Sequence, residues 1–213
     1  VSPRTNKMIL PISIQETASQ ILYRKDPKTE KTIIKGMNAS GVDELFSTGD
    51  MLSTVLKDVF SDVNIYDNNI RLLQTPFVSP ISESAISFYK FYLMDTVMVD
   101  KHECVHLTFV PQNSQDFGFT GHLYVLKDST YAVKRCLMNL PKKSGVNFVE
   151  NLDIIQNYEQ LLNGQWVLTD DDMIVDLALF KSMQGIQVER TTKYTSHSFD
   201  PIEARLFKLK GDV

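Results

Sequence analysis

Apolar and polar residues alternate along most of the chain between Ile86 and Tyr194. Successive side chains of a strand point to opposite faces, so this pattern predicts strands with one buried face. Short clusters of Asn, Asp, Ser and Gly interrupt the alternation, and such short connections join antiparallel neighbours. We therefore expect a meander of strands near 87–99, 102–111, 117–127, 131–140, 146–160, 165–180 and 186–199.

The region before the meander contains one helical pattern. Apolar residues recur there at intervals of three and four, which predicts an amphipathic helix over 49–60. We expect an extended stretch over 9–23 and a returning strand over 31–37. Nearer the meander, we expect an irregular connection over 75–80 and a short helical turn over 82–86. The expected fold is mainly β (α+β): a strongly curved antiparallel meander that forms an open half-barrel, plugged by one or two short helices.

Two cysteines, Cys104 and Cys136, raise the question of a disulfide. A turn centred within 112–116 places Cys104 opposite Tyr124, and the next turn places Cys136 opposite Gly121. The two sulfurs are then two strands apart, about 9–10 Å. That separation is too long for a disulfide, so we expect two free, mostly buried thiols.

The same register gathers apolar side chains on one face of the strands near 87–99, 102–111 and 117–127. These residues line the concave face of the expected half-barrel, where they either form a cavity for an apolar ligand or pack as ordinary core. The candidates are Phe91, Leu93, Val105, Leu107, Phe109, Phe119, Leu123 and Val125.

Three histidines are the main candidates for other chemistry. His102 and His106 alternate on one strand with Cys104 between them, and the predicted register places His122 opposite His106. Such a group can bind zinc, but histidines are also ordinary polar residues of strands, and we expect no metal site. The run 170–172 of three aspartates matches no calcium loop and predicts a solvated bend or bulge. No nucleophile elbow or phosphate-binding loop occurs, so we expect neither a catalytic residue nor a cofactor, and no enzyme.

Composition narrows the possible partners. The net charge of −4 argues against nucleic acid, which requires a clustered basic face. No apolar run approaches the roughly 20 residues of a membrane-spanning helix. The chain begins Val1-Ser2-Pro3-Arg4, which is typical of a segment inside a longer protein.

Several segments, in order along the chain, resemble landmarks of one uncharacterised domain family of Bacteroidetes-type bacteria. They are Asn64-Ile65-Tyr66-Asp67-Asn68-Asn69-Ile70, Ser79-Pro80-Ile81, Phe88-Tyr89-Lys90-Phe91-Tyr92, Asp128-Ser129-Thr130-Tyr131-Ala132-Val133-Lys134 and Asn147-Phe148-Val149. Members of that family follow a carboxypeptidase-regulatory-like domain and precede an outer-membrane β-barrel. A more distant resemblance, through Phe117-Gly118-Phe119-Thr120-Gly121 and the strands around it, is to the half-barrel fold of lipoprotein carriers.

These resemblances imply a periplasmic location within an outer-membrane-associated protein. We expect residues 1–213 to form a single, monomeric domain, with an extended arm at 1–11 and a linker to the membrane barrel at 200–213. The expected function is non-catalytic binding of a lipid or lipoprotein acyl chain in the concave face. The alternative is an interaction module with a filled core, which presents sheet edges to its own barrel or to another envelope protein.

Overall fold

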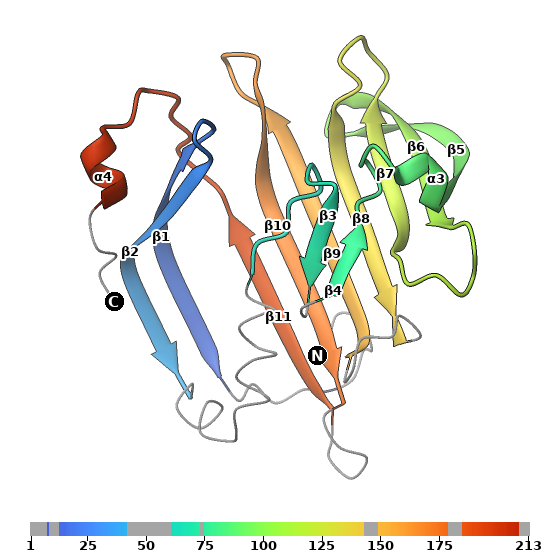
Figure 1. Ribbon diagram of the computed structural model, residues 1–213, viewed down its shortest axis with the longest axis horizontal. Helices are drawn as coiled ribbons and strands as arrows, with labels where there is room; N and C mark the ends of the chain where they lie inside the picture. The colour runs from blue at the N-terminus through green and yellow to red at the C-terminus, as the bar shows by residue number, and fades with distance from the viewer. Residues whose placement is uncertain are drawn as a thin grey trace. The chain divides into compact units, whose positions relative to one another are not determined.

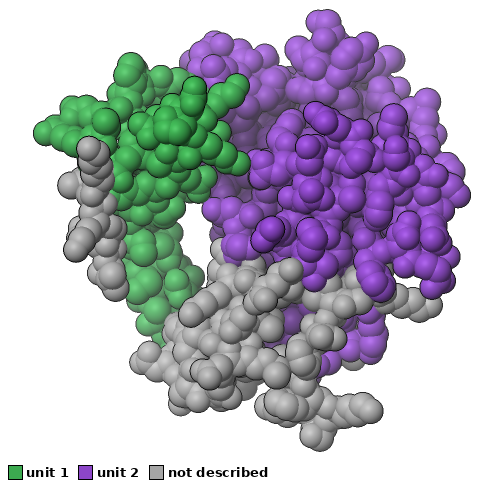
Figure 2. Space-filling view, viewed as in Figure 1, with its two compact units in different colours: residues 1–54, 197–213 green, residues 55–196 purple. Residues whose placement is uncertain are grey.

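The computed structural model describes residues 8, 13–41, 61–72, 75–142, 149–178 and 185–208. The chain forms two compact units, one of residues 1–54 and 197–213 and one of residues 55–196 (Figure 2). The helix predicted over 49–60 lies outside the described residues, as does most of the predicted arm. In the described part of the chain, no helix is long and apolar enough to cross a membrane.

The second unit is built on an open, seven-stranded antiparallel sheet (Figure 1). Each strand pairs with its neighbour in the chain, so the order is β11-β10-β9-β8-β7-β6-β5 and the predicted meander is confirmed. The strands are β5 (Tyr89–Val99), β6 (His102–Pro111), β7 (Thr120–Leu126), β8 (Val133–Pro141), β9 (Val149–Gln160), β10 (Trp166–Leu177) and β11 (Ile186–Lys193).

The register between β6 and β7 differs from the predicted one by two residues. Val105 lies opposite Val125, and Phe109 lies opposite Gly121. The cause is the connection, in which the Asp116 N–H donates to the Asn113 carbonyl (3.0 Å) and centres the turn nearer residue 115. A shift of two preserves the alternation, so the predicted faces are retained although the predicted partners were wrong.

A short hairpin, β3 (Asn69–Leu72) with β4 (Thr75–Val78), packs on one face of the sheet (Figure 1). The prediction of an irregular connection over 75–80 was therefore wrong for 75–78. Pro76 interrupted the expected strand pattern, but among the described strands β4 pairs with β3 alone, and proline is compatible with such an edge position. The expected helical turn follows as α3 (Ala85–Phe88).

The core of this unit lies between the hairpin and the sheet. Phe77 of β4 packs against Phe119, which precedes β7, with ring centroids 5.2 Å apart. Each fully buried side chain of this size contributes roughly 1.5–3 kcal/mol relative to exposure. The largest buried members are Ile65, Leu72, Phe77, Tyr89, Phe109, Phe119, Met138, Leu140, Leu152, Ile154, Met173 and Leu177. One face of the sheet is thus covered by chain that precedes it in sequence.

Both cysteines are free and buried, which confirms the prediction. Their strands are separated by β7, and the register points Cys104 to one face of the sheet and Cys136 to the other. No rotamer change brings the sulfurs together, because the sheet itself lies between them.

The first unit contains a long hairpin, β1 (Ile14–Arg24) with β2 (Thr29–Ser40), and the short helix α4 (Ala204–Lys208). The Lys31 ammonium donates to the Leu206 carbonyl (3.0 Å), and the Arg24 guanidinium lies 4.9 Å from the centre of the Phe207 ring. The segment predicted as a C-terminal linker therefore contains a helix that packs on β2.

Candidate functional site

Strand β5 forms one edge of the seven-stranded sheet and is unusually apolar for an edge. Within the described residues, no strand pairs with its outer side. It is 11 residues long, and Lys90 and Asp95 are its only charged residues. Its exposed apolar side chains are Tyr92 (51%), Leu93 (71%), Met94 (59%) and Met98 (66%). We call the outer side of β5, with these four side chains, the β5 edge.

The backbone of the β5 edge offers unpaired hydrogen-bonding groups in a regular series. The Gln112 N–H donates to the Phe88 carbonyl (2.8 Å), which fixes the residues that bond toward β6. Because alternate residues of a strand bond to opposite sides, the main-chain groups of Tyr89, Phe91 and Leu93 point away from β6. A bulge between Leu93 and Asp95 ends this series.

The opposite edge, β11, has a different character. It is shorter, with eight residues, and exposes Glu189, Thr191 and Lys193. Charged side chains on a short strand are a common protection against unwanted strand pairing. Both edges are unpaired among the described strands, and β5 is the longer and the less charged of the two.

The structure brings the predicted cavity residues together on one face. Phe91 lies opposite Phe109, Leu93 opposite Leu107, and Val105 opposite Val125. The remaining two candidates, Phe119 and Leu123, belong to the buried cluster that includes the hairpin.

Burial divides these residues into two groups. Phe109, Phe119 and Leu123 are buried in the cluster that includes the hairpin. Phe91, Leu107 and Val125 are partly buried against the same cluster, Val105 is half-buried, and Leu93 is exposed. The first group is core, whereas the second forms an apolar strip that leads to the β5 edge.

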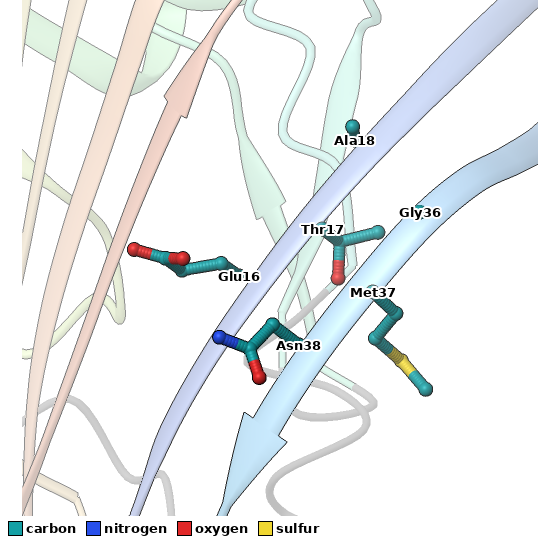
Figure 3. Close-up of a pocket in the computed structure, with 6 residues that line it drawn as sticks. All are labelled: Glu16, Thr17, Ala18, Gly36, Met37 and Asn38. Carbon is teal, nitrogen blue, oxygen red and sulfur yellow. The ribbon is translucent and has the colours of Figure 1, made fainter.

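A depression of about 380 Å³ lies on the β1–β2 hairpin (Figure 3). Glu16 and Asn38 project to one side of the ribbon, and Thr17 and Met37 project to the other. All the lining residues are exposed, and a Cβ added at Gly36 would meet no atom within 4 Å. Ligand sites enclose most of their ligand, so this open depression is a feature of the ribbon surface and not a pocket.

A buried polar network joins the sheet to the segment 61–66. The Arg190 guanidinium of β11 pairs with the Asp171 carboxylate of β10 and donates to the Ser61 carbonyl (2.6 Å). The Gln156 amide of β9 donates to Asp171 (3.0 Å) and to the Val63 carbonyl (2.8 Å). Burial raises the pKa of the Asp171 carboxyl, while Gln156 and Arg190 act in the opposite direction. The network anchors the chain that leads into the hairpin.

The prediction of a solvated bend or bulge over 170–172 was therefore wrong for Asp171, which is buried within a strand. These residues lie in strand β10, and Asp171 is 1% exposed. Its charge is tolerated because Arg190 and Gln156 satisfy both carboxylate oxygens. An irregularity does occur, between Leu168 and Asp170.

The histidine candidates separate into a pair and a single residue. His106 Nε2 and His122 Nδ1 lie 3.0 Å apart on β6 and β7. Their register is diagonal, because His106 lies opposite Tyr124 and His122 lies opposite Thr108. His102 packs instead against the Trp166 ring, with centroids 5.6 Å apart. Among the described residues, no group of three or more His, Cys, Asp and Glu side chains is arranged to hold a metal ion.

An open antiparallel meander with one face packed against a hairpin defines a β-sheet module. The chain belongs to the family of unknown function DUF5686, whose model matches residues 4–195. No curated protein and no solved structure matches it. The expectation of an uncharacterised family is confirmed.

Proposed function

We propose that the chain is a non-catalytic interaction module that binds an extended segment of a partner protein along the β5 edge. The observation that supports this most directly is the contrast between the two edges of the sheet. Strand β5 has 11 residues, of which only Lys90 and Asp95 are charged, and its outer side is open in the described structure. The opposite edge is shorter, and three of its eight residues are charged: Glu189, Arg190 and Lys193.

Strand addition uses the groups that β5 presents. Main-chain hydrogen bonds supply affinity, and side chains on alternate positions supply specificity. An added strand would bond to Tyr89, Phe91 and Leu93 and would cover the exposed part of Leu93. An extended segment with apolar residues at alternate positions matches this surface, because it continues the apolar face of the sheet.

We propose that this interaction takes place in the periplasm, next to the outer membrane. The resemblance to a family that lies between a carboxypeptidase-regulatory-like domain and a membrane β-barrel supports this location. The partner is then the protein's own barrel or another envelope protein.

The test is photo-crosslinking in the bacterium that produces the protein. A photoreactive amino acid at position 93 is compared with the same group at position 191 on β11. We expect a discrete crosslinked protein from position 93 only. A synthetic peptide of the crosslinked segment should bind the purified chain, and the same peptide with alternate backbone N–H groups methylated should not. Equal crosslinking at both positions, or equal binding of the methylated peptide, would refute the proposal.

The apolar strip favours a second candidate, which is binding of a lipid or lipoprotein acyl chain. Leu93 is exposed beside half-buried Phe91 and Leu107 on one face, which supports a shallow apolar site there. Native mass spectrometry of the purified chain tests it, because a bound lipid adds a discrete mass. The lipid should be lost in Leu107→Asp and retained in the edge control Thr191→Asp. Protein free of lipid would leave the interaction module as the better proposal.

A further inference from the structure

Two imidazole nitrogens converge on the face of the β6–β7 pair opposite to the one that packs against the β3–β4 hairpin. His106 Nε2 and His122 Nδ1 are 3.0 Å apart, and their ring centroids are 5.0 Å apart. Two nitrogens bound to one tetrahedral zinc ion, each about 2.0–2.1 Å from the metal, lie about 3.3–3.4 Å from each other. The observed separation differs from that distance by a few tenths of an ångström, which a small rotation of either ring supplies.

The two rings are held in this orientation by their neighbours. The His106 ring stacks on Tyr124 with an interplanar angle of 7° and centroids 4.6 Å apart. Thr108 Oγ1 lies 3.2 Å from the same Nδ1 atom of His122. Because the rings are already ordered, a ligand that bridges them loses little entropy in fixing them.

The two facing nitrogens bind a metal ion when neither of them carries a proton. Without a metal ion, the two facing nitrogens are joined by a hydrogen bond, so one of them carries a proton. A metal ion replaces that proton, and with the remaining protons on His106 Nδ1 and His122 Nε2 both lone pairs point to the ion. Both side chains are half-buried, so water has access to the space between the rings.

We infer that His106 and His122 form an open two-histidine site for a late first-row transition-metal ion of the Zn²⁺, Ni²⁺ or Cu²⁺ type. Imidazole favours these ions over Mg²⁺ and Ca²⁺, which prefer oxygen ligands. The described residues supply no third strong donor, so water occupies the remaining coordination positions. Open positions of this kind are typical of sites that exchange ligands and not of closed structural zinc sites.

His102 provides a matched control within the same strand. It lies on the same face of β6 as His106, but its ring packs against Trp166 and is not paired with another histidine in the described structure. The chain has four histidines in all, and His197 belongs to the other unit. Loss of binding on removal of His106 or His122, but not of His102, therefore locates the site.

The experiment is calorimetric titration of the whole chain, prepared without a histidine tag and treated with a chelator. Ni²⁺, Zn²⁺ and Cu²⁺ are compared with Mg²⁺ on the natural chain and on His106→Gln, His122→Gln and His102→Gln. We expect one equivalent of Ni²⁺ to bind, and affinity to fall about tenfold or more in the first two variants, since even loss of a group that only orients a ligand costs 10–100-fold. His102→Gln should change affinity by less than about twofold, and Cu²⁺ should bind most tightly.

A second measurement keeps the inference testable if either variant is misfolded by circular dichroism. Electron paramagnetic resonance of the natural chain with one equivalent of Cu²⁺ should show two imidazole nitrogens bound to the ion. A spectrum with one imidazole, equal loss of affinity in all three variants, or no saturable binding would overturn the inference.

Discussion

Replacement of Asp171 by Asn tests whether the buried polar network holds the segment 61–66 on the sheet. The change keeps the shape of the side chain and the hydrogen bond from Gln156, but it removes the charge that faces Arg190. The Arg190 side chain is 10% exposed, so its guanidinium loses most of its compensation. We expect the variant to fold with a lower free energy of unfolding.

The magnitude follows from the geometry of the pair. Removal of one partner of a buried ion pair costs about 3–5 kcal/mol when the other charge is left without compensation. Arg190 still donates to the Ser61 carbonyl, and the side-chain amide introduced in Asp171→Asn can still accept a hydrogen bond, so part of that cost is avoided. We therefore expect a loss of about 2–3 kcal/mol. The double variant Asp171→Asn/Arg190→Gln should lose less than the sum of the single variants, by about 1 kcal/mol or more.

Urea unfolding followed by fluorescence of Trp166, the single tryptophan, measures these changes within the second unit. The matched control is Asp172→Asn, the same substitution one position along β10, where the half-buried side chain points to the other face of the strand. It should stay within about 0.5 kcal/mol of the natural chain. If Asp171→Asn also stays within that limit, or if the double variant loses the full sum, the ion pair does not anchor the segment.

Gly121→Ala should destabilise the second unit by about 1–3 kcal/mol in the same urea assay, because a Cβ there would collide with the Leu137 carbonyl oxygen. An unchanged unfolding midpoint for Gly121→Ala would contradict the close approach of these strands. Burial raises the pKa of the thiols of both Cys104 and Cys136. Neither thiol should therefore react with a thiol-specific reagent in the folded chain near pH 8, whereas both should react when the chain is unfolded in guanidinium chloride. Rapid reaction of one thiol under native conditions would show that its strand opens locally.

The strands of the meander could be predicted closely from local pattern. The prediction over 102–111 coincides with β6, and the one over 186–199 begins at the first residue of β11. Alternation is a local property, and short connections leave few choices of neighbour. The register between β6 and β7 was harder to predict. It depends on which residue lies at the centre of the connecting turn, and the hydrogen bonds of Asn113 determine that residue.

The hairpin that covers the sheet could not be predicted in the same way. Its strands have four residues each, too few to show alternation, and Pro76 suggested a connection. What makes them strands is burial of Ile70 and Phe77 against the sheet, a contact between segments distant in sequence.

The buried network did leave a signal in the sequence. Gln156 occupies the same alternate positions as Ile154 and Tyr158, and Asp171 shares those of Met173 and Val175, so both polar residues fall on the apolar side of their strands. Polar residues at buried positions of neighbouring strands predict a hydrogen-bonded partner pair. The ion pair between Asp171 and Arg190 could not be predicted in this way. It depends on the register between β10 and β11, which the sequence pattern does not determine.

The buried polar network and the two proposed sites lie on different strands of the sheet. The network lies on β9–β11, whereas the β5 edge and the histidine pair lie on β5–β7. A substitution at an exposed position of β5 can therefore test binding without changing stability. Leu93→Lys should leave the free energy of unfolding within about 0.5 kcal/mol of the natural value. The same charge should abolish strand addition, since lysine protects natural edge strands. A large loss of stability in Leu93→Lys would mean that Leu93 belongs to the core, and the β5 edge would no longer support an interaction module.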